Sequence, residues 1–157
     1  MWVSRRTDYA TRALLALAVA DGGPLKLEEI AGRTGAPQSV VEQVMPIMRS
    51  AGLVRSERGR AGGYRLNKKP SEITLERVVR LFQGQLAPIG CATRKDPEPC
   101  TMTIGCSLRA VWEEVRDATI AILSRTTLEE LARRAEGPWR PPAGQAAPMG
   151  TKLEVIS

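Results

Sequence analysis

The chain of 157 residues contains no histidine. Enzymes use histidine most often as a general base near neutral pH, and this side chain is missing here. No serine or cysteine has an evident partner that would activate it as a nucleophile. Neither a Walker phosphate-binding motif nor a glycine-rich dinucleotide fingerprint lies between a predicted strand and a predicted helix. These absences predict that the protein is not an enzyme.

Long hydrophobic runs are also missing. The best candidate, residues 13–20, spans only eight residues, whereas a membrane-spanning helix needs about 20. Cysteine is scarce, with three in the chain. An odd number without a secretory signal argues against a structural disulfide framework. We therefore expect a soluble protein of the reducing cytoplasm with no membrane segment.

In the first 70 residues, acidic residues are fewer than basic ones. Residues 1–70 carry 12 Lys and Arg against 6 Asp and Glu, whereas residues 71–157 carry 11 of each class. The whole net charge of +6 thus lies in the first part. Such an excess is typical of a nucleic-acid-binding module, because basic side chains attract phosphates and release counterions. A solvated basic face is the alternative on charge alone.

Apolar periodicity predicts three helices in this basic part. The first is capped by Ser4 or Thr7, the second covers residues 27–34, and the third opens at Pro37 and ends before Gly52. The tight connection at residues 34–37 is typical of a helix-turn-helix.

A hairpin follows the third helix. Residues 53–56 and 64–66 have strand-like patterns, and residues 57–63 form a basic, glycine-rich loop between them. We therefore predict a mainly α fold with a small β-hairpin wing, in which the third helix enters the major groove.

Beyond residue 70 the pattern predicts a short helix capped by Thr74, a long helix opening at Ser107 and a terminal helix that starts from a capping box near Thr127. The long helix has an apolar side with little chain left to cover it, which favours a homodimer; an intramolecular core is the alternative for Trp112. The predicted division is a winged helix-turn-helix (1–70), a connecting helix and linker (71–90), a cysteine loop (91–106), dimerisation and terminal helices (107–136) and a disordered tail (137–157).

All three cysteines, Cys91, Cys100 and Cys106, lie within sixteen residues. Thiolates on one short loop bind zinc, hold an iron–sulfur cluster or form a redox switch. Three separately buried cysteines are the structural alternative. The polar, turn-prone residues 92–99 do not favour burial, so the spacing points to one site.

The order of these motifs resembles one known family. Val41-Glu42-Gln43 in the third helix, Gly52-Leu53-Val54 after it, the wing at residues 58–66 and the three clustered cysteines are similar to the IscR/NsrR/RirA regulators, the Rrf-two (Rrf2) family. The resemblance covers roughly residues 1–135. It implies a homodimeric repressor of transcription on double-stranded promoter DNA, whose iron–sulfur cluster responds to nitric oxide, redox state or iron supply.

The resemblance also assigns DNA contacts. The reading side of the third helix would be Gln38, Ser39, Glu42 and Gln43, and the wing contacts would be Arg58, Arg60, Gly62, Gly63 and Tyr64. Glutamine pairs with adenine, glutamate accepts from cytosine, and arginine binds phosphate or guanine. The chain departs from the family in its longer first cysteine spacing and in Pro46, which we expect to bend the third helix.

The fourth cluster ligand is open, since some members use a histidine. By resemblance to NsrR-type members, Asp8 of the partner subunit would supply it; Asp8 as a simple complement to a helix N-terminus is the alternative. Asp96 and Glu98 are poorer candidates. Three thiolates and one oxygen suit a [4Fe–4S] cluster, with [2Fe–2S] second and zinc third. Rival functions are a thiol-redox switch or interaction module without a cluster, and an electron-transfer or cluster-carrier protein.

Overall fold

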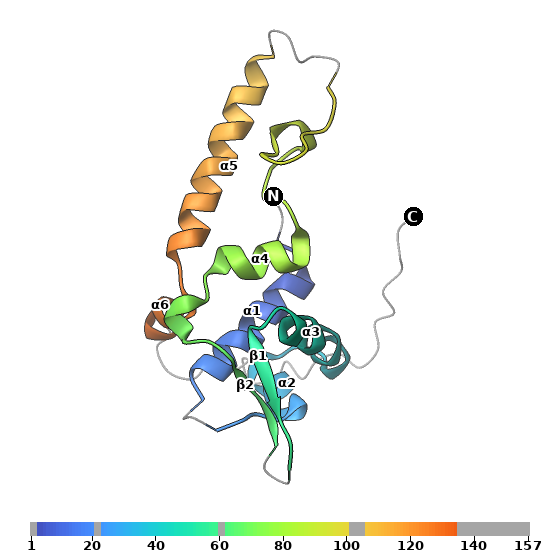
Figure 1. The fold of residues 1–157 in the computed structure, drawn as a ribbon, viewed down its shortest axis with the longest axis vertical. Helices are drawn as coiled ribbons and strands as arrows, with labels where there is room; N and C mark the ends of the chain where they lie inside the picture. Colours follow the sequence, from blue (N-terminus) through green and yellow to red (C-terminus); the bar gives the residue numbers. More distant parts are fainter. Residues whose placement is uncertain (1–2, 21–22, 60–61, 101–105, 135–157) are drawn as a thin grey trace.

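The computed structural model has two parts (Figure 1). We call residues 3–83 and 128–134 the body, and we call the part that projects from it, residues 84–125, the arm. The structure describes residues 3–20, 23–59, 62–100 and 106–134. The predicted tail and Arg60 lie outside these residues. The elements in chain order are α1 (Arg5–Ala18), α2 (Leu27–Thr34), α3 (Gln38–Ser50), β1 (Val54–Glu57), β2 (Gly63–Leu66), the 3₁₀ turn η1 (Pro70–Glu72), α4 (Leu75–Gln83), the 3₁₀ turn η2 (Gly90–Ala92), α5 (Ser107–Arg125) and α6 (Leu128–Arg134).

Helix α1 runs through the body and begins where the sequence predicts. The hydroxyl of Ser4 accepts the backbone N–H of Thr7 at 3.2 Å. Such a cap stabilises a helix by about 1 kcal/mol. Ala10, Ala13 and Leu14 are fully buried, and their spacing of three and four residues gives α1 one continuous apolar face.

A single buried threonine shapes the turn between α2 and α3. The hydroxyl of Thr34 donates to the carbonyl of Ile30 at 2.8 Å and accepts the N–H of Ala36 at 3.3 Å. Gly35 then ends α2 with a left-handed φ of 65°. These bonds set the direction in which α3 leaves the turn.

Helix α3 has one buried and one exposed face. Val41, Val44, Met45 and Met48 are fully buried against the body. Pro46 lies on the exposed side, and the helix continues through it to Ser50. The buried face therefore fixes α3 with its opposite face toward solvent.

The wing is an antiparallel hairpin in which Val54 pairs with Leu66 and Glu57 pairs with Gly63. Tyr64 extends this pairing to Leu25 before α2, with N–H to carbonyl distances of 2.8 and 2.9 Å. Strand β2 thus has a partner on each side. The predicted fold class, a mainly α protein with a small β-hairpin wing, is confirmed.

The terminal helix α6 returns to the body, which the sequence analysis did not anticipate when it grouped this helix with the dimerisation helix. Leu128 is fully buried in the same core as Leu14. Its N–H donates to the carbonyl of Ile73 at 3.0 Å, and the N–H of Leu75 donates to the carbonyl of Thr126 at 2.9 Å. The base of α5 is therefore tied to the body on both sides.

Among the described residues, no helix is long and apolar enough to cross a bilayer.

Candidate nucleic-acid interface and cysteine loop

The predicted reading side of α3 lies on the surface. Gln38, Ser39, Glu42 and Gln43 are all exposed. The side-chain amide of Gln38 donates to the carboxylate of Glu42 at 2.9 Å. This pair places a donor and an acceptor side by side on one helix face, which is the chemistry needed to read base edges in a major groove.

Among the predicted wing contacts that the structure describes, one is an exposed arginine and the others make close contacts within the protein. Arg58 is exposed near the tip of the hairpin. A Cβ on Gly63 would lie 2.5 Å from the carbonyl oxygen of Leu25, and one on Gly62 would lie 2.5 Å from that of Glu57. Tyr64 packs against the core. The two glycines and the tyrosine thus build the hairpin, and their contact with DNA stays a prediction.

The cysteine loop follows α4 and lies beside the projecting part of α5 (Figure 1). Cys91 is half-buried in the turn η2, and Cys100 is exposed. Cys106 is half-buried and is the residue that immediately precedes α5. Cys91 and Cys106 therefore lie at the two ends of one loop, and Cys100 lies between them along the chain.

Arg109, in the first turn of α5, marks the place where the loop and the helix meet. The hydrogen bond from Arg109 to Glu113, at 3.0 Å, and the charge of Glu113 raise the pKa of this guanidinium. The nearby thiols of Cys91 and Cys100 add to the rise. Both thiols thus lie within electrostatic reach of a cation that is three residues from Cys106.

The predicted ligands are not assembled into one set within a single chain. Among the described residues, no three His, Cys, Asp or Glu side chains lie close enough together to hold a metal ion. Asp8 lies on α1, where its carboxylate pairs with Arg12 at 2.8 Å. The chemistry of the loop nevertheless fits an iron–sulfur cluster, because such clusters are held by cysteine thiolates.

Glu98 folds back over the start of the loop. Its N–H donates to the carbonyl of Gly90 at 3.2 Å. A Cβ on Gly90 would lie 2.0 Å from a carboxylate oxygen of Glu98. The carboxylate thus lies against the residue that precedes Cys91, and a side chain at position 90 would displace the exposed end of Glu98.

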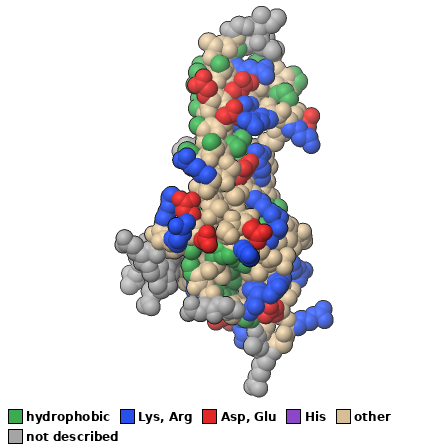
Figure 2. All heavy atoms as spheres, turned by 60° about the vertical axis from the view of Figure 1, so that its left-hand side comes forward, with side chains coloured by type: hydrophobic (Ala, Val, Ile, Leu, Met, Phe, Trp, Pro, Cys, Tyr) green, Lys and Arg blue, Asp and Glu red, His purple; other side chains and the backbone are tan. Residues whose placement is uncertain are grey.

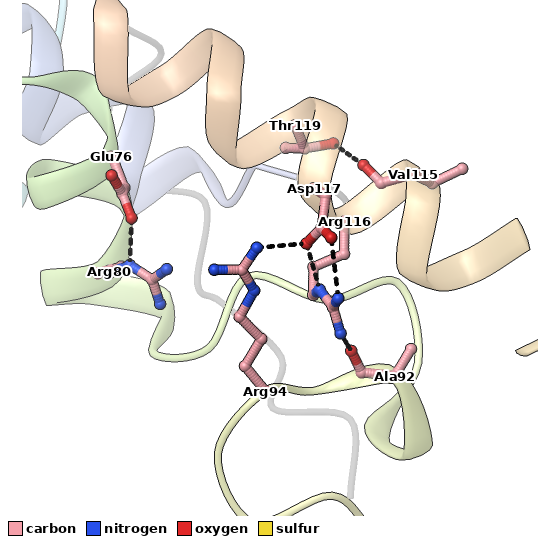
Figure 3. A network of polar contacts seen from close by, with 8 residues as sticks. All are labelled: Glu76, Arg80, Ala92, Arg94, Val115, Arg116, Asp117 and Thr119. Atoms are coloured by element: carbon pink, nitrogen blue, oxygen red, sulfur yellow. Dashed lines mark hydrogen bonds and ion pairs between the residues drawn. The ribbon is translucent and has the colours of Figure 1, made fainter. Parts of the chain in front are cut away.

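A polar cluster on the other side of η2 was not predicted from the sequence (Figure 3). The side chain of Arg116 donates to the carbonyl of Ala92 at 2.5 Å and to Asp117 at 2.7 Å. Arg94 donates to the same carboxylate at 3.0 Å. The hydrogen bond from Arg116, with a contribution from Arg94, lowers the pKa of Asp117 from 3.8 to about 2. We call Arg94, Arg116 and Asp117 the Arg116 cluster.

The projecting surface of α5 carries an apolar stripe. Hydrophobic side chains appear among charged ones along the upper part of the molecule in Figure 2. The exposed members on α5 are Leu108, Val111, Trp112, Val115 and Ile122. In the described chain Trp112 is therefore not an interior core residue, and the stripe has no cover from the body.

The family is decided by comparison with known proteins. A family model named Rrf2 and described as an iron-dependent transcriptional regulator matches residues 3–134. The chain belongs to the Rrf2 family. The resemblance seen in the sequence is confirmed, and the protein is a DNA-binding transcriptional regulator, not an enzyme.

Relatives of this Rrf2 protein carry regulator names. It is 35% identical over 136 residues to an Rrf2-like HTH-type transcriptional regulator of Rhodobacter capsulatus, covering 82% of this chain and 91% of the relative. It is 34% identical over 138 residues to CymR of Bacillus subtilis, covering 87% and 94%. It is also 34% identical over 137 residues to IscR of Photorhabdus laumondii, covering 87% and 82%.

Solved structures support the same fold for this family member. CymR, named as the global cysteine regulator of B. subtilis, aligns with a TM-score of 0.75 at 31% identity, covering 87% of this chain and 99% of that one. IscR of T. potens aligns with a TM-score of 0.70 at 30% identity, covering 87% and 89%. The winged-helix prediction is confirmed by these neighbours.

Proposed function

We propose that this Rrf2 regulator is a homodimeric repressor that binds double-stranded promoter DNA in the cytoplasm, and that an iron–sulfur cluster on the cysteine loop controls this binding. The signal would be nitric oxide, redox state or iron supply. The observation that carries the proposal is that Cys91, Cys100 and Cys106 lie on one loop, which ends at the start of an α5 with an uncovered apolar stripe. The iron-dependent description of the family agrees with it.

Cys91, Cys100 and Cys106 would hold the cluster through three thiolates. Arg109 would offset part of their negative charge. When bound, the cluster would supply a centre whose oxidation state and ligands change on contact with nitric oxide or oxidants. We favour [4Fe–4S], with [2Fe–2S] as the second choice, because three thiolates and a weaker oxygen ligand leave one iron reactive.

Asp8 of the partner subunit is the proposed fourth ligand. Ligation requires this carboxylate to leave Arg12, and both side chains of the pair are more than two-fifths exposed. Exposed ion pairs contribute roughly 0–1 kcal/mol to stability, so losing the pair between Asp8 and Arg12 destabilises the protein only slightly. The position of Asp8 on α1 would connect the cluster to the DNA-binding body of the other subunit.

The homodimer would form through the apolar stripe of α5. Removing its five large side chains from water is the main driving force available to this arm, and a two-fold axis would place two copies of α3 for paired half-sites. Gln38, Ser39, Glu42 and Gln43 would read bases, and the wing would contact the backbone or the minor groove.

Anaerobic purification tests the cluster. We expect a coloured protein whose native mass is that of a dimer with about four irons and four sulfides per chain. The Cys100→Ser variant should lose the colour, and Asp8→Ala should shift the absorbance or speed cluster loss. The control is Asp96→Asn, which removes a loop carboxylate but keeps a residue type that tolerates the left-handed φ of 49° at this position, and it should leave both unchanged. A colourless wild-type protein without iron or sulfide would contradict the proposal.

Promoter binding is tested separately by a salt series. Gln43→Ala should lose about 1–3 kcal/mol of discrimination at one base position. Arg58→Ala should weaken binding to all sequences and reduce the slope against log salt by about 0.9. A cluster-containing protein that shows no salt-dependent promoter binding would instead be an electron-transfer or carrier protein.

A thiol-redox switch is the second candidate. It is favoured by the free, solvent-accessible thiols of the exposed Cys100 and the half-buried Cys91 on one loop. Mild oxidation followed by peptide mass spectrometry would then give a specific Cys91–Cys100 disulfide, and reconstitution with iron and sulfide would give no cluster.

A further inference from the structure

The backbone is held on both sides of Cys91. Before Cys91, the carbonyl of Gly90 accepts from Glu98, whose carboxylate also covers Gly90. After Cys91, the carbonyl of Ala92 accepts from Arg116 at 2.5 Å. The side chain of Ala92 is itself fully buried. Cys91 therefore lies between two anchored neighbours, whereas Cys100 lies in an exposed part of the loop.

Arg116 is unusual on its helix. It is 9% exposed and is the one buried residue of α5, where most of the large apolar side chains are exposed instead. A buried guanidinium is tolerated when hydrogen bonds and an opposite charge replace the lost water. Here the carboxylate of Asp117 and the carbonyl of Ala92 provide these partners.

The same carboxylate binds a second point of the loop. Arg94 reaches Asp117 at 3.0 Å, so residues 92 and 94 are both attached to one turn of α5 (Figure 3). Arg80 and Glu76 form another ion pair nearby, at 2.8 Å, but this pair stays within α4. The Arg116 cluster is thus a specific connection between the cysteine loop and α5, and the Arg80 pair is a matched ion pair that makes no such connection.

We propose that Arg116, held by Asp117, is a positioning residue that keeps Cys91 in place against α5 before any metal is bound. The inference rests on the proposed function in one respect, the role given to this positioning, which is to present the first cluster ligand in a fixed position. The positioning itself is a property of the metal-free chain. It also makes α5, the proposed dimerisation helix, the element to which the first ligand is attached.

The test is thiol alkylation of the reduced, metal-free full-length protein. Iodoacetamide labelling is followed at each cysteine by peptide mass spectrometry. In Arg116→Met, we expect Cys91 to react at least about fivefold faster, the factor expected when a local opening equilibrium loses one charge-assisted hydrogen bond. Cys106, which is also half-buried and is 14 residues from Ala92 along the chain, is the internal reference and should react at the wild-type rate.

Three further variants separate positioning from a general structural effect. Arg80→Met removes the matched ion pair and should change no cysteine. Arg116→Lys retains a donor for the Ala92 carbonyl and should bring the Cys91 rate back to within about twofold of wild type. Asp117→Asn leaves the guanidinium in place without its anchor and should raise the Cys91 rate about threefold or more, above the rate of Arg116→Lys; if Arg116→Met does not fold by circular dichroism, this variant decides, and a rate equal to that of Arg116→Lys overturns the inference.

The inference is overturned by an unchanged Cys91 rate in a folded Arg116→Met protein, or by equal increases at Cys91 and Cys106. Cluster reconstitution gives an independent readout, since a displaced first ligand should alter the visible circular dichroism of the loaded Arg116→Met protein relative to Arg80→Met. Failure of the wild-type protein to bind a cluster would remove the proposed function and leave the alkylation result standing.

Discussion

The body and the arm of this protein are stabilised in different ways. Helix α1 has six buried residues among fourteen, and all but one of them are apolar. Helix α5 has one buried residue among nineteen, and that residue is Arg116. The body therefore has its own hydrophobic core, whereas α5 is attached to the cysteine loop through the Arg116 cluster and leaves its apolar stripe uncovered. A partner chain on this stripe and a cluster on the loop, as proposed, would stabilise the arm.

The largest effect is expected in the body. Leu128→Ala should lower the free energy of unfolding by about 2–5 kcal/mol, because it leaves a cavity in the core that α6 shares with α1. Urea unfolding at two protein concentrations measures this loss, which should be the same at both. The control is Leu108→Ala, on the arm and 61% exposed. Its effect should depend on concentration, because the proposed dimer would bury this side chain; an equal loss at both concentrations would show that the arm has a core of its own.

A second prediction concerns the uncovered stripe. Val115→Asp should weaken dimerisation about a hundredfold or more, since it places an unpaired carboxylate in the proposed interface. Sedimentation equilibrium reports the change. Ser124→Asp introduces the same charge on the opposite face of α5 and should leave the dimer intact. Equal behaviour of the two variants would remove the stripe as the dimer interface.

The smallest predicted effect is the pH dependence of the Arg116 cluster. The folded-state pKa of Asp117, about 2, lies below its ordinary value of 3.8. A depressed carboxylate pKa stabilises the folded state above the ordinary value, and this stabilisation is lost as pH falls from 3.8 toward 2. The difference in Tm between wild type and Asp117→Asn should thus be constant from pH 6 to about 5 and shrink below about 4.

Asp96→Asn, in an exposed part of the loop, is the control for that series and should follow the wild-type curve. A Tm difference for Asp117→Asn that persists unchanged down to pH 2 would show that the charge of Asp117 is not what binds the two arginines.

The sequence was sufficient for features that depend on near neighbours. Ser4 and Thr74 accept N–H groups three residues ahead, and Gly35 follows the last residue of α2, so each helix end was predictable within one or two residues. The alternating strands and the glycine-rich loop likewise predicted the wing. The cysteines, close along the chain, also predicted one site, but the described residues do not bring them into one ligand set, so the site stays a prediction.

Contacts between distant residues were not predictable in this way. Leu128 donates to Ile73, and nothing local in α6 distinguishes return to the body from continuation along the arm. The role of Arg116 was not predictable either, because one arginine on a helix rich in charges resembles the others. Its partner is a backbone carbonyl 24 residues away. A buried charge bound to a main-chain group has no sequence pattern.

Helix α5 is attached to the body at its C-terminal end, so a change in its tilt displaces its N-terminal end the most. Bonds from Leu75 to Thr126 and from Leu128 to Ile73 fix the lower end of the helix to the body, and the cysteine loop lies beside the upper end. Nineteen residues of α-helix measure about 28 Å, so a tilt of about 10° at the base corresponds to about 5 Å at the tip. In the proposed dimer paired along α5, small rearrangements of the loop would therefore change the separation of the two α3 helices, and this separation has to match the spacing of the operator half-sites.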